Sequence, residues 1–139
     1  MYNVYLGMGE TLNKYVQQIK ADLEINQINI ADVARSLPAK RHFWTARLIE
    51  HKCRINSLEK QKSIIIKEVS SRISKDSPVA LDNKNVLRVA ESSDEIKSIN
   101  EQIAENKLLV EFLEQVQKNF FTASHDIRNI VDIMKMEQL

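Results

Sequence analysis

The side chains that most often carry out chemistry are few in this chain and poorly spaced for it. The histidines and the single cysteine are His42, His51, Cys53 and His125. His51 and Cys53 are two residues apart, so on a helix they point in different directions. No Asp or Glu stands three residues before a histidine, the spacing of the metal-binding pair of helical bundles. We therefore expect no metal centre and no catalytic residues among these four, and a role in surface or interface packing.

Glycine is missing where a cofactor loop would need it. Both glycines, Gly7 and Gly9, lie in the first nine residues, and none follows them. Loops that cradle phosphates, and the fingerprint of dinucleotide-binding proteins, need glycines between a strand and a helix. The sequence therefore predicts a protein that is not an enzyme and that holds no cofactor.

Lysine and arginine, in contrast, are concentrated in one segment. Between Ala39 and Lys75 there are ten Lys or Arg residues and three acids, a net charge of +7 in a chain whose total is +1. Such an excess attracts a polyanion. If the partner is a nucleic acid, the contacts are with phosphates, because these side chains displace counterions without reading bases, and a single strand fits such a surface better than a duplex. The residues expected to make them are Arg41, Arg47, Lys52, Arg54, Lys60, Lys62, Lys67, Arg72 and Lys75.

This segment leaves alternatives open. Acids of residues 91–114 could neutralise the bases across a helical hairpin or between subunits. The chain could also be a structural coiled-coil adaptor whose basic helix docks an acidic protein partner. Phe43 and Trp44 lie among the bases, so a base of single-stranded nucleic acid could stack on an exposed ring. For Trp44 packing is the stronger alternative, because it heads an apolar seam.

Two stretches have apolar residues at alternating steps of four and three, the pattern of helices that pack lengthwise. The first runs from Trp44 to Arg72 and is interrupted at His51, Lys62 and Arg72. The second is Ile96, Ile99, Ile103, Asn106, Val110, Leu113, Gln117 and Phe120. We predict an all-α fold, a long helical hairpin or bundle with coiled-coil-like seams.

The chain is expected to form one helical domain with four segments. Residues 1–37 would be an amphipathic segment, 38–75 the basic helix, 76–91 a connector and 92–139 a C-terminal helical region. Pro38 either opens the basic helix or lies in one that began earlier. Residues 86–89 fit either a short strand or a helical turn. Ser92 and Glu95 have the spacing of a capping box, which predicts Ser92 as the N-cap of the second long helix.

The two helices carry more apolar residues than one hairpin needs. Those outside the seams, expected to be exposed and covered by a partner, are Ile49, Ile64, Ile66, Leu109, Phe112 and Val116. We therefore predict a closed homo-oligomer held by residues 92–139. Its interface would comprise Ile99, Ile103, Asn106, Val110, Leu113, Gln117 and Phe120, with the two polar members setting the register.

The remaining features of the sequence concern its compartment. No apolar run approaches the roughly 18–20 residues that span a bilayer. A single cysteine cannot form an internal disulfide, which suits a reducing compartment. The sequence thus predicts a cytoplasmic protein with no membrane partner.

The order of these features resembles the UvsY-type recombination mediators of T4-like phages, over about residues 38–139 and more loosely over the first 37. The resemblance rests on the long basic helix with an aromatic residue near its start, residues 59–62 (Glu-Lys-Gln-Lys), the pair Ile66 and Lys67, a polar connector, and a C-terminal helix that includes residues 126–130 (Asp-Ile-Arg-Asn-Ile). The basic motif of that family has the form Leu-Lys-Ala-Arg-Leu, and Ile66 and Lys67 match its first two positions. Residues 68–70 depart from it, and Arg72 lies three positions after the arginine of the motif.

The resemblance implies a non-enzymatic homo-oligomer that binds and wraps single-stranded DNA. It implies that the protein helps to load a RecA-like recombinase onto DNA coated by single-strand-binding protein, in the cytoplasm of a host cell. Of the motif residues, Lys67 carries over as a DNA contact, and Arg72 is a candidate substitute for the arginine.

Overall fold

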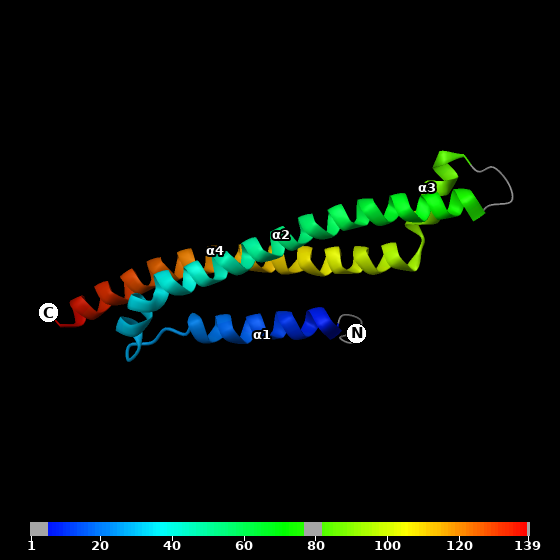
Figure 1. Ribbon diagram of the computed structural model, residues 1–139. Coiled ribbons are helices and arrows are strands. Elements are labelled where there is room, and N and C mark those ends of the chain that lie inside the picture. Colours follow the sequence, from blue (N-terminus) through cyan, green and yellow to red (C-terminus); the bar gives the residue numbers. More distant parts are fainter. Residues whose placement is uncertain (1–5, 77–81, 139) are drawn as a thin grey trace. The chain divides into compact units, whose positions relative to one another are not determined.

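The computed structural model describes residues 6–76 and 82–138, which form helices and the short turns between them (Figure 1). The helices are α1 (Leu6–Asp22), α2 (Ile30–Asp76), α3 (Asn83–Glu91) and α4 (Asp94–Glu137). No strand occurs in these two stretches. The predicted all-α fold is confirmed.

The residues form two compact units, and both long helices contribute to each of them. Unit 1 consists of residues up to 49 and from 109 onward, so it contains α1, the start of α2 and the end of α4. Unit 2 consists of residues 50–108, which include the rest of α2, all of α3 and the start of α4.

Unit 1 has the larger hydrophobic core, to which three helices contribute. Ile19 comes from α1, and Ile30, Val33, Leu37, Trp44 and Leu48 come from α2. The end of α4 adds Leu113, Val116, Phe120 and Ile127. Trp44 and Phe120 are completely buried, and aromatic side chains of that size contribute most of the apolar area removed from water.

Two asparagines fix the turn between α1 and α2. The Oδ1 atom of Asn26 accepts from the backbone N–H groups of Ile28 and Asn29, at 2.8 and 2.9 Å. In return, Oδ1 of Asn29 accepts from the N–H group of Asn26 at 2.8 Å. Side chains of this kind satisfy backbone donors at a turn. α2 begins directly afterwards at Ile30 and includes Pro38. The predicted start of the basic helix at residue 38 is therefore too late, and a helix that began earlier is correct.

Unit 2 has a smaller core, built where α2 and α4 pack antiparallel. Leu58 of α2 is buried with Ile99 and Ile103 of α4, and Ile55 and Ile65 pack beside them.

The predicted connector contains α3. Asp82 caps this helix, because its Oδ1 atom accepts from the backbone N–H group of Asn85 at 2.8 Å. Val86 and Ala90 form its buried face. For residues 86–89 the helical alternative is therefore correct.

The N-cap of α4 is Ser93, one residue later than predicted. Its Oγ atom accepts from the N–H group of Ile96 at 3.4 Å. Ser92 instead ends α3, where its Oγ donates to the carbonyl oxygen of Val89 at 2.9 Å. The capping-box prediction was wrong because the end of α3 already uses Ser92, which leaves Ser93 to start α4.

The buried face of α4 follows the predicted seam only in its first half. Ile96, Ile99, Ile103 and Asn106 are buried as expected, and so are Leu113 and Phe120. In the second half Leu109 and Val116 are buried as well, whereas Val110 and Gln117 are half-buried. The prediction that Leu109 and Val116 are exposed is therefore wrong. Three helices contribute to the core of unit 1, so α4 presents a broader apolar face there than a two-helix seam requires.

Candidate nucleic-acid interface

In unit 2, the side of α2 that points away from its packed seam has no acidic residue. The positions on this side, which we call the outer face, are Cys53, Asn56, Ser57, Lys60, Ser63, Ile64, Lys67, Ser70, Ser71 and Ser74. All are exposed except Ser70, which is half-buried. Lys60 and Lys67 lie about 10 Å apart along the helix axis at 1.5 Å per residue. The outer face therefore combines two ammonium groups with a row of small hydroxyl side chains.

The other predicted contacts of unit 2 lie at the edges of this face or closer to the seam. Its two edges each carry one exposed lysine and one exposed glutamate, Lys52 with Glu59 and Lys75 with Glu68. Arg54 and Arg72 are exposed further round the helix, towards α4. Lys62 occupies a seam position and is half-buried. A lysine at such a position keeps its charge in water by extending its stem along apolar neighbours.

Acids of α4 neutralise part of this charge, as the first alternative supposed. Arg72 donates to Oε1 of Glu95 at 3.1 Å, and the side chains of both residues are more than half exposed. Exposed ion pairs contribute about 0–1 kcal/mol and are weakened by salt. Lys60 and Lys67 lie on the opposite side of α2 from the seam that packs on α4. The outer face is thus directed towards solvent rather than towards the acids of α4.

In unit 1 the bases have different surroundings. Lys40 lies 3.7 Å from Oδ1 of Asp22, and both side chains are mostly buried. The guanidinium carbon of Arg47 is 4.7 Å from the centre of the Phe43 ring, a cation–π distance. Arg41 is exposed and lines a pocket of about 220 Å³ with Pro38, Ser124 and neighbouring residues. These bases lie in unit 1, whereas the outer face lies in unit 2. Their neighbours are both apolar and polar.

The structure decides the role of Trp44. Its side chain is 0% exposed, and its Nε1 donates to Oδ2 of Asp22 at 2.9 Å. Trp44 is therefore a packing residue. Phe43, its neighbour, is 42% exposed. Sequence reasoning missed Asp22 as the partner of Trp44, because the two are 22 positions apart and no local pattern links them.

The predicted oligomer interface lies mostly inside one chain. Ile99, Ile103, Asn106, Leu113 and Phe120 are buried, and Val110 and Gln117 are half-buried. The polar members have partners within the chain. Gln117 donates to Oγ1 of Thr45 at 2.8 Å, and Asn106 lies 2.9 Å from Nδ1 of His51. The assignment of these seven residues to an interface between copies stays a prediction.

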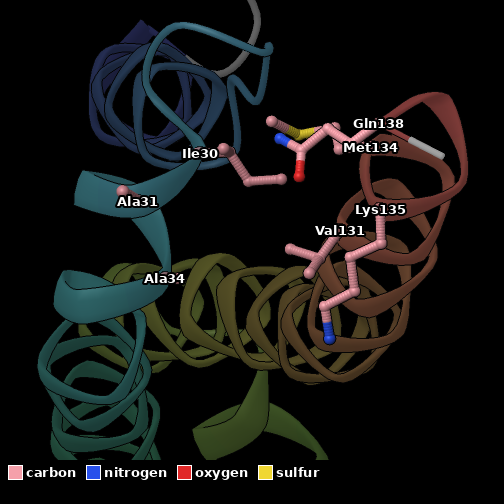
Figure 2. Close-up of a pocket in the computed structure, with 7 residues that line it drawn as sticks. All are labelled: Ile30, Ala31, Ala34, Val131, Met134, Lys135 and Gln138. Carbon is pink, nitrogen blue, oxygen red and sulfur yellow. The ribbon is translucent and has the colours of Figure 1, made fainter.

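Exposed apolar residues of unit 1 gather near the end of α4. Val131, Ile133 and Met136 are 36%, 53% and 71% exposed. Of these three, Val131 lines a pocket of about 250 Å³, together with Ile30, Ala31, Ala34, Met134, Lys135 and Gln138. Figure 2 shows three side chains extending towards one another: Ile30 at the start of α2, Met134 near the end of α4, and Gln138, the residue after α4. This end of the unit presents apolar surface to solvent.

Among residues 6–76 and 82–138, no group of three or more His, Cys, Asp or Glu side chains could hold a metal ion. Over the same stretches, no helix is both long and apolar enough to cross a membrane.

The fold and this surface define an all-α protein whose longest helix exposes a basic, acid-free side. Among solved structures, the chain is similar to the recombination mediator protein UvsY of bacteriophage T4. One crystal structure of UvsY, in lattice type IV, matches with a TM-score of 0.77 and 16% identity, over 91% of this chain and 98% of that one. A second, in lattice type II, matches with a TM-score of 0.75 and 15% identity, over 92% and 98%. No family model matches the sequence, and comparison with curated proteins gives no match. This chain therefore has the fold of UvsY, as the resemblance in sequence order predicted.

Proposed function

We propose that this protein binds single-stranded DNA through the outer face of α2 and acts as a recombination mediator. In this role it helps a RecA-like recombinase to replace single-strand-binding protein on DNA. The observation that carries the proposal is the outer face itself, with Lys60 and Lys67 exposed among serines and the neighbouring acids, Glu59 and Glu68, at its two edges. The fold shared with a protein described as a recombination mediator supports the same function.

The chemistry of the outer face fits phosphates better than it fits an acidic protein. Lysine ammonium groups attract a chain of phosphates whatever its base sequence, and binding releases counterions. Serine hydroxyls donate single hydrogen bonds to phosphate oxygens, and hydroxyl side chains are common phosphate contacts. An acidic protein partner, as in the adaptor alternative, would gain more from arginines that bind carboxylates with two parallel hydrogen bonds. Arginine is missing from the outer face and occurs at its flanks.

The proposal requires no catalysis and no cofactor, and it includes assembly of several copies. Val131, Ile133 and Met136 at the end of α4 are the apolar residues that we assign to contacts between copies, since exposed apolar groups of this kind mark interaction sites. Sedimentation of the wild type and of Ile133→Asp/Met136→Asp tests this part. An oligomer that dissociates in the double variant is expected, and a wild type that is monomeric at micromolar concentration would refute it.

The test of DNA binding compares two double variants with equal loss of charge. Lys60→Ala/Lys67→Ala removes both lysines of the outer face, and Lys97→Ala/Lys107→Ala removes two exposed lysines of α4 in the same unit. In fluorescence anisotropy with oligothymidylate at low salt, the first should weaken binding about tenfold or more, and the second by less than about twofold. Equal weakening by both would mean that total charge, rather than the outer face, governs binding.

The mediator role needs a second assay. A RecA-like recombinase is added to single-stranded DNA coated by single-strand-binding protein, and its ATP hydrolysis is followed. The wild-type chain should shorten the lag before hydrolysis, and Lys60→Ala/Lys67→Ala should not. An unchanged lag with the wild type, together with acidic proteins recovered on the basic helix, would favour the adaptor alternative.

A further inference from the structure

We propose that unit 1 contains a second DNA contact, a pocket beside Phe43 that receives one unstacked nucleobase. This inference rests on the proposed function, because it supposes that single-stranded DNA is the ligand. The pocket has a volume of about 360 Å³ and lies between α1 and α2. It is lined by Gln18, Ala21, Asp22, Phe43 and Trp44, and we call it the Phe43 pocket.

The aromatic side of the pocket, the Phe43 ring, packs against the buried ring of Trp44. Trp44 is completely buried, and its ring meets that of Phe43 edge-to-face, with centroids 5.1 Å apart and planes at 89°. Tyr15 of α1 meets Trp44 in the same way, at 5.3 Å and 81°. The hydrogen bond from Trp44 to Asp22 fixes the indole further. Phe43 is therefore supported by a rigid neighbour while 42% of its surface remains exposed, so a base can stack there at little cost in side-chain entropy.

The positive charge beside the ring suits a nucleotide rather than a simple apolar ligand. The guanidinium carbon of Arg47 lies 4.7 Å from the centre of the Phe43 ring. The guanidinium therefore covers one face of the ring, a base would stack on the other, and the positive charge attracts the phosphate that accompanies the base.

The polar side of the pocket suits the edge of a base. An ionised carboxylate offers about four acceptor positions, and Asp22 uses part of them for Trp44 and Lys40. The remaining capacity can accept from the ring N–H or amino group that every nucleobase presents on its pairing edge. Gln18 is exposed at the same pocket and offers both a donor and an acceptor. The pocket therefore fits nucleobases as a class.

A pocket of this kind separates single strands from duplexes. In a duplex the pairing edge and both faces of a base are occupied, and extruding it costs unstacking and unpairing energy. The lysines of the outer face contact phosphates and do not make this distinction. The Phe43 pocket would thus give the protein its preference for single strands.

The experiment uses two DNA probes of equal length and charge, oligothymidylate and a fully abasic oligonucleotide. Stacking of one base contributes about 1–3 kcal/mol, which corresponds to about 5- to 150-fold in affinity. The wild type should bind oligothymidylate more tightly than the abasic probe by a factor in this range. Phe43→Leu, which keeps apolar volume but lacks an aromatic face, should remove that difference and leave affinity for the abasic probe unchanged. Phe43→Tyr should preserve it.

A second readout needs no variant. Trp44 is the only tryptophan of the chain and lines the pocket, so its fluorescence should change when oligothymidylate binds and stay constant with the abasic probe. Equal affinity of the wild type for both probes, or an equal loss with both in Phe43→Leu, would overturn the Phe43 pocket and leave the outer face intact. Failure of the wild type to bind either probe would instead refute the proposed function.

Discussion

At the scale of residues, the nine predicted contacts differ in what surrounds them. Lys60 and Lys67 are exposed on a side of α2 without acids, Lys62 is half-buried at a seam position, and Arg72 is paired with Glu95. The sequence contained part of this distinction, because Lys62 and Arg72 interrupt the apolar repeat and therefore had to lie near the partner helix. The ion pair between Arg72 and Glu95 could not be predicted from the sequence, because it depends on where α4 begins.

The row of serines beside Lys60 and Lys67 was present in the sequence but was not recognised. Projecting residues 53–74 onto a helix places these side chains together, and the burial pattern agrees with that projection. The partner of Trp44 was not predictable in this way. Asp22 is on another helix, and only the packing of α1 on α2 brings its carboxylate to the indole.

We predict that Asp22 stabilises unit 1 through Trp44. Asp22→Ala leaves the buried indole N–H without an acceptor, which should lower the free energy of unfolding by about 1–3 kcal/mol. Lys40→Met removes only the ion pair with Asp22 and keeps an apolar stem, so it should cost less than about 1 kcal/mol. Urea unfolding measures both variants. Equal destabilisation would mean that the hydrogen bond to Trp44 contributes nothing.

At the scale of elements, patterns of apolar residues predicted the helices well and their ends less well. α2 and α4 were expected from their repeats, and both extend further than the repeats do. Pro38 is compatible with a helix start, since proline is favoured in the first turn, but Val33 and Leu37 pack in the core and stabilise the helix before it. Ser92 and Ser93 are equally good caps in sequence, and the length of α3 decided between them.

Polar residues within the seam connect α2 to α4 in unit 2. The Nδ2 atom of Asn106 donates to the carbonyl oxygen of Gln102 at 2.8 Å, so its Oδ1 faces His51 and accepts from Nδ1 at 2.9 Å. Asn106 is buried, and a buried polar residue of this kind fixes the alignment of two helices at some cost in stability.

A double-mutant cycle tests this pair. His51→Leu and Asn106→Leu should each destabilise the protein, because each removes the hydrogen bond between the two side chains. The double variant should be more stable than the sum of the two predicts, with a coupling of about 0.5–1.5 kcal/mol. Unfolding in urea supplies all four free energies, and additive effects would show that the two side chains do not interact.

At the scale of the whole chain, the all-α fold class could be predicted from the sequence. Which apolar faces are buried within one chain could not. Alternating steps of four and three residues indicate helices that pack lengthwise, and the fold matches that of UvsY at only 16% identity. The seven residues assigned to contacts between copies mostly form the interior of one chain. An apolar repeat predicts that a helix face is buried, but it does not indicate whether the same chain or a second copy covers that face.

The distribution of charge is the property of the whole chain on which the proposed function depends. The total is +1, yet the segment between Ala39 and Lys75 carries +7. Lys60 and Lys67, with Lys75 at the edge of the outer face, give three exposed ammonium groups to which a phosphate chain can bind.

The most direct test is the salt dependence of binding to oligothymidylate. Each phosphate neutralised on a single strand contributes about −0.7 to the slope of log affinity against log salt concentration, so three contacts predict about −2 per chain. Lys60→Ala/Lys67→Ala should reduce the magnitude of that slope by about 1.4, since two of the three contacts are removed. A wild-type slope near zero, or a slope that the double variant leaves unchanged, would contradict binding of single-stranded DNA by the outer face of α2.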